Sequence, residues 1–316
     1  MKVSIIIVNY NGKSLLKMLL ASIKKSTFRD CEVIIADNNS IDGSQDFVKK
    51  NYKYVKLIEN KKNLGYSGIN SALEYCKGEY ILFLNNDMEL DKDCIKNLVK
   101  SIRLDEDIAM AAPRLINFYD KTILSGGTWV SKAFYNGHIK GNGMKAKEMP
   151  YLGVGLIRKD FVDMFGYLFD PDYFIYAEDL DLGLRIRLNG KKIMFSPEAI
   201  TYHMHAVTTQ KISGAFTTFL MEKNLLTTFF KILSVNNIFL FLPYVLLARF
   251  IAILKDLSAL KINTAFARLK AVSFILFKFN LIIKKRRQTQ KFRKVGDSYI
   301  LKVFSEKYLF KPKFIV

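Results

Sequence analysis

The 316-residue sequence contains little cysteine, histidine or tryptophan: three, three and one residue respectively. Cys31, Cys76 and Cys94 are not closely paired and no cysteine follows them, which argues against a disulfide framework or a cysteine-based zinc site. The N-terminus has a single lysine, then the β-branched run Val3–Val8, and no small-residue cleavage site. We therefore expect a first strand rather than a signal peptide, and an active region in a reducing cytoplasm.

Internal repeats and low-complexity linkers are also missing. Hydrophobic residues make up 50% of the sequence and aromatic residues 13%, which excludes the apolar-poor composition of a disordered chain. The length suffices for one large domain, or for one domain with an appendage.

Acidic residues are scarce in the last third of the sequence. Residues 208–316 contain 20 Lys+Arg and 4 Asp+Glu, so they carry +16 of the total charge of +20, whereas residues 1–207 carry +4. The same third is apolar at Phe216–Leu233, Ile238–Leu254 and Val272–Ile283. Basic residues beside long apolar runs suit an anionic membrane surface better than nucleic acid, which we do not expect as a partner.

The run Ile238–Leu254 is at the short limit for a membrane span, which needs about 20 apolar residues. Pro243 and Arg249 interrupt it, and both favour a helix in the membrane interface over one that spans. We expect residues 1–207 to form the catalytic domain. Residues 208–316 would form a helical region that holds the protein at the cytoplasmic face of the cell membrane, peripherally or re-entrantly rather than by spanning.

Short β-rich runs alternate with helical patterns in the first hundred residues. The strands are expected at Val3–Val8, Glu32–Ala36, Val55–Ile58 and Tyr80–Leu84, and the helices near Ser14–Lys25, Ser44–Asn51, Tyr66–Cys76 and Lys92–Arg103. This alternation predicts an α/β fold with a Rossmann-like, mostly parallel central sheet. Ligands bind beyond the carboxyl ends of such strands, and these ends are polar here.

The following residues are less regular. Residues 113–150 are rich in glycine and indicate hairpins and a loop. A strand at Gly153–Arg158, a helix from Asp160, a second helix at Asp179–Asn189 and a last strand at Lys192–Ser196 are expected after them.

Two strand ends carry candidate ligand-binding carboxylates. Asn85-Asn86-Asp87 can place a divalent cation between Asp87 and a diphosphate, although such a tripeptide also suits a plain turn. Asp37 can accept hydrogen bonds from a nucleobase or ribose, or it can belong to a capping cluster with Asp42.

Glu178-Asp179-Leu180-Asp181 follows the aromatic run Tyr173–Tyr176. Acidic residues at a helix N-terminus are favoured by its dipole, but three carboxylates in four residues exceed what capping needs. An aromatic wall beside a carboxylate can hold a sugar ring and raise the pKa of a base. Further along the chain, His203 or His205 can complete a metal site with Asp87.

Six ordered motifs together resemble family 2 glycosyltransferases of the GT-A fold, and most closely their rhamnosyltransferase-like branch, which builds surface polysaccharides and glycans. The motifs are Val3–Gly12, Asp37-Asn38-Asn39-Ser40, Asn63-Leu64-Gly65, Leu82–Asp87, Tyr176–Gly190 and Pro197–His203. The resemblance covers about residues 1–207. Lys223-Asn224, before an apolar helix, is similar to C-terminal extensions of membrane-associated members.

The resemblance implies a role for each matching residue. Asp179 would be the catalytic base, and Asp87 and His203 would bind Mg²⁺ or Mn²⁺ at the diphosphate. Asn85 stands where the strictest family pattern has Asp, so this metal site has one charge fewer. The remaining substrate-binding candidates are Val8, Asn9, Tyr10, Asp37, Asn63, Gly65, Asn86, Glu178 and Arg185.

The function implied is inverting transfer of a sugar from a UDP- or dTDP-sugar to a saccharide acceptor, expected to be lipid-linked. One alternative is a nucleotidyltransferase that makes sugar nucleotides, but the glycine-rich, basic phosphate loop of such enzymes is not found after the first strand. The other is a non-catalytic membrane adaptor with a degenerate transferase domain. Turnover of a sugar nucleotide would exclude it.

Overall fold

The computed structural model describes residues 2–139, 145–204 and 214–305. Its α-helices are α1 (Lys13–Lys25), α2 (Ser44–Asn51), α3 (Cys94–Ile102), α4 (Lys159–Phe165), α5 (Glu178–Leu188), α6 (Gly214–Ile232), α7 (Val235–Ser258), α8 (Ile262–Phe277), α9 (Phe279–Gln290) and α10 (Asp297–Leu301). Its strands are β1 (Val3–Asn9), β2 (Cys31–Asp37), β3 (Lys56–Glu59), β4 (Tyr80–Asn85), β5 (Met88–Leu90), β6 (Ile108–Asn117), β7 (Ile123–Ser125), β8 (Thr128–Val130), β9 (Asn136–His138), β10 (Lys147–Glu148), β11 (Gly155–Arg158) and β12 (Lys192–His203).

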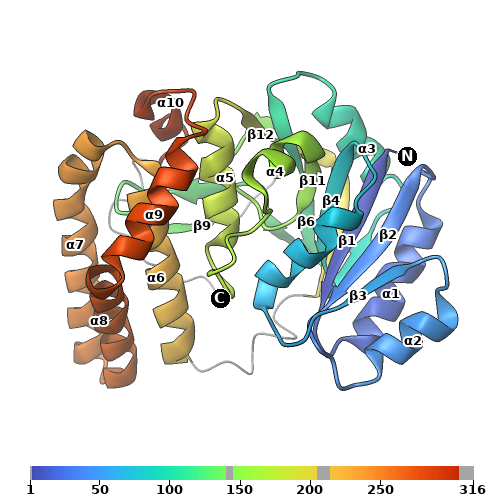
Figure 1. Ribbon diagram of the computed structural model, residues 1–316, viewed down its shortest axis with the longest axis horizontal. Coiled ribbons are helices and arrows are strands. Elements are labelled where there is room, and N and C mark those ends of the chain that lie inside the picture. The colour runs from blue at the N-terminus through green and yellow to red at the C-terminus, as the bar shows by residue number, and fades with distance from the viewer. Residues whose placement is uncertain (1, 140–144, 205–213, 306–316) are drawn as a thin grey trace.

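The central sheet has the order β10-β12-β6-β11-β4-β1-β2-β3 (Figure 1). Strands β4, β1, β2 and β3 are parallel neighbours, as the strand–helix alternation predicts. Strand β11 runs antiparallel between β4 and β6, while β6 and β12 are again parallel. Because β2 and β4 lie on opposite sides of β1, the chain reverses its winding direction there, and ligands bind at such switch points.

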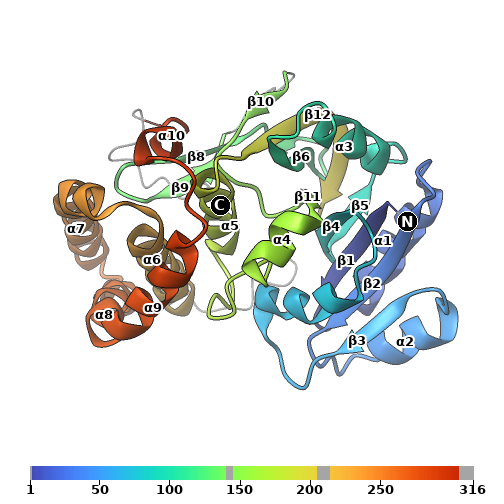
Figure 2. The ribbon, with the colours of Figure 1, turned by 45° about the horizontal axis from the view of Figure 1, so that its top comes forward.

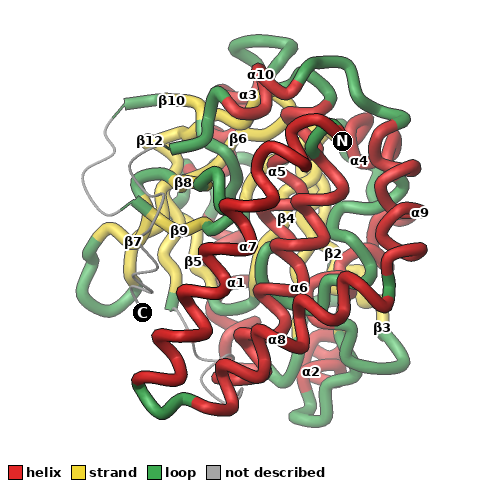
Figure 3. Tube along the Cα trace, turned by 90° about the vertical axis from the view of Figure 1, so that its left-hand side faces the viewer, coloured by secondary structure: helices red, strands yellow, loops and turns green. Residues whose placement is uncertain are grey.

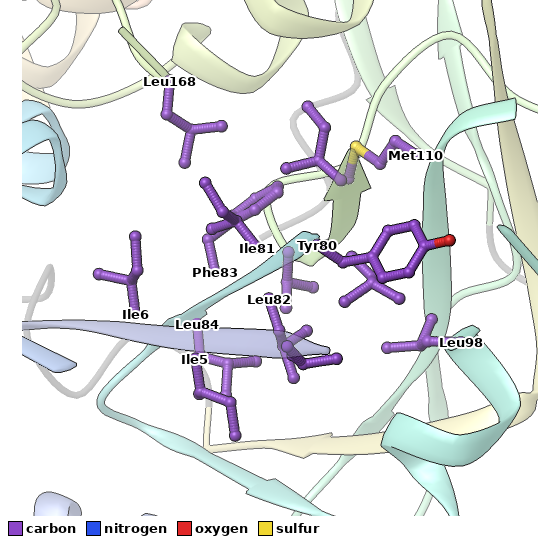
Figure 4. Packing of buried hydrophobic residues seen from close by; sticks show 14 of the residues in the cluster. Ile5, Ile6, Tyr80, Ile81, Leu82, Phe83, Leu84, Leu98, Met110 and Leu168 are labelled. Carbon is purple, nitrogen blue, oxygen red and sulfur yellow. The ribbon is translucent and has the colours of Figure 1, made fainter. Parts of the chain in front are cut away.

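Side chains of β1 and β4 fill the centre of the molecule (Figure 4). Ile5 and Ile6 on β1 and Leu82 and Phe83 on β4 are at most 1% exposed. Strands buried on both faces read as continuous apolar runs, which is why the sequence locates them within one or two residues at each end.

Strands β5 and β6 are not expected from the sequence, and three expected elements differ in form. The helix expected at Tyr66–Cys76 is a 3₁₀-helix, η1 (Gly65–Tyr75). Strand β12 continues beyond Ser196 to His203 across an irregularity between Ser196 and Ile200, and Pro197 lies in that break. The apolar run Val272–Ile283 is divided between α8 and α9 at Lys278. Apolar pattern alone does not register such local breaks.

The C-terminal helices share a hydrophobic core with the catalytic region. Leu180, Leu184 and Leu188 of α5 belong to one buried cluster with Leu225 and Phe229 of α6. Figure 2 shows α5 between the sheet and the C-terminal helices. The run Phe216–Leu233 is therefore largely core rather than membrane surface. The division at residues 207 and 208 stays a proposal about architecture, because a shared core does not separate independently folding units.

Candidate active site

The ends of β2, β1 and β4 are linked by a short chain of side-chain hydrogen bonds. Asn9 Nδ2 donates to Asp37 Oδ2 at 2.7 Å, and Asn86 Nδ2 donates to Asn9 Oδ1 at the same distance. Asn9 and Asp37 are opposite each other in the parallel register of β1 and β2. Gly12 is required here, since a Cβ at this residue would lie 2.1 Å from Asn86 Nδ2. Hydrogen bonds thus join Asn9, Asp37 and Asn86, which the sequence analysis predicts to bind substrate.

Asp37 is buried and its carboxylate is fully engaged. Besides Asn9 it accepts hydrogen bonds from the backbone and hydroxyl of Ser40 and from Gln45 Nε2. Val8 is half-buried beside Asn9, whereas Tyr10 is 38% exposed at the strand end. Asp42 contacts Ser44 and the backbone of Lys13, so the capping role expected for it is compatible with its contacts.

Asn63 and Gly65 form the turn into η1. Asn63 Oδ1 accepts a hydrogen bond from the Gly65 backbone at 2.9 Å. Gly65 has φ +62°, and a Cβ there would lie 1.9 Å from the Phe174 carbonyl oxygen, so only glycine fits. The next residue, Tyr66, donates its backbone N–H to that carbonyl at 2.8 Å. This contact joins the β3–η1 turn to the segment before α5.

Asp87 and His203 are brought together by a strand pairing far apart in the sequence. Strand β5 begins one residue after Asp87 and pairs with the end of β12, where His203 lies opposite Met88. The backbone of Met204 donates to the Asp87 carbonyl at 3.0 Å. His203 Nε2 lies 3.2 Å from Asp87 Oδ1, and both side chains are largely buried.

The donor set at Asp87 fits a divalent cation. Asp87 Oδ1 is buried, and it places a carboxylate oxygen directly beside the imidazole nitrogen of His203. Carboxylate and imidazole are both common ligands of divalent metals. Within residues 2–139, 145–204 and 214–305, no group of three His, Cys, Asp or Glu side chains could hold an ion, so any metal here would need ligands from substrate or water. His205 lies outside the described residues.

The segment before α5 has unusual backbone geometry. Tyr176 and Ala177 have φ of +69° and +58°, the left-handed region that residues with a Cβ rarely adopt. Asn224 of α6 donates to the carbonyl oxygens of Ile175 at 3.1 Å and Tyr176 at 2.7 Å. Strained residues persist where their surroundings determine them, and here α6 supplies two of those contacts.

Glu178 and Asp179 begin α5 and have raised pKa values. Burial raises the pKa of Asp179 to about 6, despite a hydrogen bond from the backbone of Leu180. Burial, reinforced by the neighbouring charge of Asp179, raises the pKa of Glu178 well above its usual value. Gly153 faces Asp179, with a built Cβ 3.4 Å from Oδ2. A carboxyl group that titrates near neutral pH is suited to general-base chemistry.

The hydroxyl of Tyr66 is influenced by the charges of Asp87, Glu178 and Asp179. Burial, followed by the charges of Asp87, Glu178 and Asp179, raises the pKa of its hydroxyl well above the usual value. Asp87 and the Glu178-Asp179 pair thus all influence the hydroxyl of the same tyrosine.

Arg185 and Asp181, in contrast, point into the protein. Arg185 is 0% exposed; it binds Asp181 and the Leu168 carbonyl and stacks over the ring of Tyr167. The structure thus contradicts the sequence-based expectation that Arg185 binds substrate, because its guanidinium has no access to solvent. Asp181 also binds Lys231 of α6 at 2.7 Å, so the third carboxylate of the cluster is structural.

The sequence analysis assigns no individual role in the site to four residues: Tyr66, Asn224, Asn38 and Asn60. Tyr66 was assigned only to a helix, and Asn224 was noted without a contact to the catalytic segment. Asn38 donates to the Gly65 carbonyl at 2.8 Å and accepts from Asn60 at 3.0 Å, which fixes the β3–η1 turn. Polar residues at neighbouring strand ends were a usable signal for Asn38 and Asn60. No sequence signal links Asn224 to residues 175 and 176.

Residues 4–152 match the family described as Glycosyl transferase family 2. The O-antigen chain rhamnosyltransferase RfbN of Salmonella typhimurium is 27% identical over 217 residues, which cover 66% of this chain and 68% of that protein. The name of this relative agrees with the rhamnosyltransferase-like branch that the sequence motifs resemble. GalNAc(5)-diNAcBac-PP-undecaprenol beta-1,3-glucosyltransferase of Campylobacter jejuni is 30% identical over 31% of this chain and 34% of that protein. The chain spans less than two thirds of several curated relatives that it matches.

A solved structure of GalNAc-T7 with UDP, GalNAc and Mn²⁺ superposes with a TM-score of 0.64 and 19% identity, over 90% of this chain and 57% of that one. At this identity the likeness shows the fold alone. The expected fold class is confirmed: a GT-A fold followed by a helical C-terminal region.

Proposed function

We propose that this chain belongs to glycosyl transferase family 2, whose model matches residues 4–152, and that it is an inverting glycosyltransferase of glycan or polysaccharide synthesis. It moves a sugar from a UDP- or dTDP-sugar to a saccharide acceptor. The observation that carries this proposal is the convergence of Asp87–His203 and Glu178-Asp179 around Tyr66. A metal-binding pair and a base of raised pKa at one sheet edge are the two components that such a transfer needs.

Asp179 is the general base of this mechanism. Its carboxylate takes the proton of an acceptor hydroxyl as the acceptor oxygen forms a bond to the anomeric carbon. The bond from that carbon to the diphosphate oxygen breaks on the opposite side, and the nucleoside diphosphate leaves with the electron pair. Single displacement inverts the anomeric configuration. Glu178 is buried beside Asp179, and the charge of Asp179 adds to the burial that raises the pKa of Glu178.

Asp87 and His203 would hold Mg²⁺ or Mn²⁺ in this reaction. Such an ion, when bound, neutralises charge on the departing diphosphate. The largely buried carboxylate and imidazole, whose Oδ1 and Nε2 atoms lie 3.2 Å apart, support this assignment. Asn86 is oriented by Asn9 and lies beside the same position.

The nucleoside part of the donor binds along the ends of β1 and β2 and the turn into η1. Val8, Asn9, Tyr10 and Asp37 line the first part, and Asn63 and Gly65 form the second. The hydrogen bond from Asn38 to Gly65 and that from Tyr66 to Phe174 hold the two parts in place before the donor arrives. Preorganisation of this kind lowers the entropic cost of binding.

The acceptor is a lipid-linked saccharide at the cytoplasmic face of the cell membrane. The relative from Campylobacter jejuni is named for an undecaprenol-linked acceptor. The basic and apolar C-terminal helices of this chain suit an anionic membrane surface, where such an acceptor would be presented.

Turnover of sugar nucleotides tests this function. Purified protein is incubated with UDP-, dTDP- and GDP-sugars with and without Mn²⁺, and release of the nucleotide is measured. We expect release from a UDP- or dTDP-sugar that depends on the metal. Absence of turnover with every donor and acceptor, in protein that binds no sugar nucleotide, would favour the non-catalytic adaptor.

A further inference from the structure

Helices α7 and α8 lie on the side of the molecule that faces the viewer in Figure 3, and both helices have large apolar side chains that are exposed. Phe239 and Phe250 of α7 are 71% and 57% exposed, and Phe266 of α8 is 64% exposed. We call the exposed apolar residues of these two helices the α7–α8 outer face: Val235, Phe239, Leu240, Tyr244, Leu246, Leu247, Phe250, Leu254, Leu257, Ile262, Phe266, Leu269, Leu276 and Phe277. Soluble monomers rarely expose a continuous apolar surface of this extent.

The opposite side of α7 packs against the protein. Phe241, Val245, Ala248 and Ala252 are buried at a spacing of three to four residues, which is one face of a helix. Because the buried side has this period, the exposed apolar residues lie on the remaining surface. A helix that is apolar on its outer side as well needs an apolar environment outside the protein.

The charges around the outer face are almost all positive. Residues 235–290 contain ten Lys and Arg but a single acidic residue, Asp256, which Arg268 neutralises at 2.8 Å. Several basic residues are tied to the protein interior, and the exposed ones are Lys255, Lys261, Lys270, Lys278, Lys284 and Arg287. An apolar face bordered by exposed lysines is complementary to anionic lipid headgroups over acyl chains.

Arg249 decides between a helix that lies on the membrane and one that spans it. In length and composition α7 is suited to crossing a membrane. Yet Arg249, in its middle, is 1% exposed, donates to the Ala133 carbonyl at 2.6 Å and pairs with Glu222 of α6 at 3.1 Å. Insertion across a bilayer would break these contacts and carry a guanidinium to the bilayer centre, which is costly.

We propose that the α7–α8 outer face docks in the plane of an anionic lipid surface, while α7 stays attached to α6 and the catalytic domain. The partner is the lipid surface itself rather than a second copy of the chain. This inference rests on the proposed function only in placing sugar transfer at a membrane. Lipid binding itself is measured without sugar transfer.

Flotation of the full chain with vesicles tests the proposal. Vesicles of phosphatidylcholine with phosphatidylglycerol are compared with vesicles of phosphatidylcholine alone. We expect binding to the anionic vesicles that falls at least tenfold in the double variant Phe250→Asp/Phe266→Asp. The matched control is Tyr54→Asp/Leu104→Asp, which alters two exposed apolar residues away from the outer face and should bind like the wild type. Circular dichroism checks that both variants are folded.

Three results would overturn the proposal. Unchanged flotation of the folded Phe250→Asp/Phe266→Asp variant would exclude the outer face as the docking surface. Resistance of vesicle-bound protein to alkaline carbonate would indicate a spanning α7. Concentration-dependent dimerisation that the double variant abolishes, without vesicle binding by the wild type, would assign the face to a second copy. Release of nucleotide with a soluble acceptor is unchanged in the double variant if the enzyme is a transferase, so failure of lipid binding and failure of catalysis are separate outcomes.

Discussion

The two neighbouring carboxyl groups at the start of α5 have different surroundings. Glu178 is buried and Asp179 half-buried, and burial raises both pKa values. The pKa of Asp179, about 6, lies below neutral pH, so most of its carboxyl groups are ionised there. A carboxylate that is ionised at neutral pH and has a raised pKa is suited to act as the base.

Asp179→Asn should abolish transfer, because the amide cannot accept the acceptor proton. A general base contributes about 10²–10⁴-fold in rate, so kcat should fall within this range. Donor affinity, measured by calorimetry, should stay within about threefold, since Asp179 does not bind the nucleotide. Glu178→Gln is the control and should lose much less activity. If Glu178→Gln were the more damaging change, the base would be Glu178.

The pH dependence of kcat/KM should report the same group. Because the base acts as a carboxylate, activity should be lost as the pH falls through about 6, tenfold per unit below it. The raised pKa also means that the folded state binds this proton more tightly than the unfolded chain. Asp179 therefore lowers the free energy of unfolding as the pH rises from about 4 to 6, and Asp179→Asn should melt at a higher temperature than the wild type at pH 7.5. If kcat/KM instead fell only well below pH 5, the group that titrates would not be Asp179.

Asp87→Ala should lower activity and the metal-dependent part of donor affinity, and His203→Ala should do so less severely. The reason is that Asp87 supplies the charge of the pair, while His203 supplies a neutral ligand. Titration of the donor with and without Mn²⁺ measures the effect. Wild-type activity that EDTA does not change would rule out the metal-dependent reaction.

At the scale of single elements, α6 carries more of the catalytic architecture than its apolar sequence indicates. Asn224 binds the carbonyls of Ile175 and Tyr176, and Lys223 donates to the Asp172 carbonyl at 2.9 Å. The Tyr173 hydroxyl binds Thr228 at 2.9 Å. One face of α6 thus holds the segment that leads into Glu178 and Asp179.

Asn224→Ala should lower kcat at least tenfold while donor affinity stays within about threefold. The change leaves two carbonyl oxygens unpaired, a cost of about 1–3 kcal/mol that favours release of the left-handed Tyr176–Ala177 turn. Asn224→Gln, which keeps the amide, should recover part of the activity. Thr227→Ala is the control, because its hydroxyl bonds only to the Lys223 carbonyl of its own helix. If Asn224→Ala lost thermal stability but kept its kcat, Asn224 would have a structural role only and the prediction would be wrong.

The sequence predicts those helices and strands that are determined by the pattern of neighbouring residues. Strands β1 to β4 and helices α1 and α2 follow from apolar period and turn residues, and the structure confirms them. The first residue of η1, Gly65, packs closely against Phe174, which is more than a hundred residues away in the sequence. The proximity of Asp87 and His203 follows from the β5–β12 pairing, which no local pattern encodes. The expectation for Arg185 was wrong because the sequence pattern of a helical arginine near acidic residues is the same whether its side chain faces the substrate or the core.

At the scale of the whole molecule, buried ion pairs connect the catalytic region to the C-terminal helices. Lys231 of α6 binds Asp170 at 2.6 Å and Asp181 at 2.7 Å, and Lys285 of α9 binds Asp170 and Asp172. Burial alone would raise the pKa of Asp170, but the two lysines hold it well below its usual value. Residues 1–207 alone would keep Asp170 and Asp181 without these lysines and would expose the α5 side of the shared core. We therefore expect that fragment to be insoluble.

Lys231→Met should lower the free energy of unfolding by about 3–5 kcal/mol, since it leaves buried carboxylates with less compensation. Urea unfolding followed by fluorescence and circular dichroism measures this change. The control is Lys159→Met, which removes an exposed pair with Asp163 and should cost less than about 1 kcal/mol. Equal effects of the two substitutions would contradict the importance of the buried pair.

The shared core also sets an order of events during translation. A ribosome that adds about 5–20 residues per second needs about 5–20 s to synthesise residues 208–305, which contain α6 to α10. Throughout that time the nascent chain has its sheet but neither Asn224 to hold the Tyr176–Ala177 turn nor Lys231 to neutralise Asp170 and Asp181. Competence for sugar transfer thus arises late, when α6 folds onto α5 and α7 and α8 follow. Under the proposed function, sugar transfer would therefore begin only when the helices proposed to face the lipid are completed.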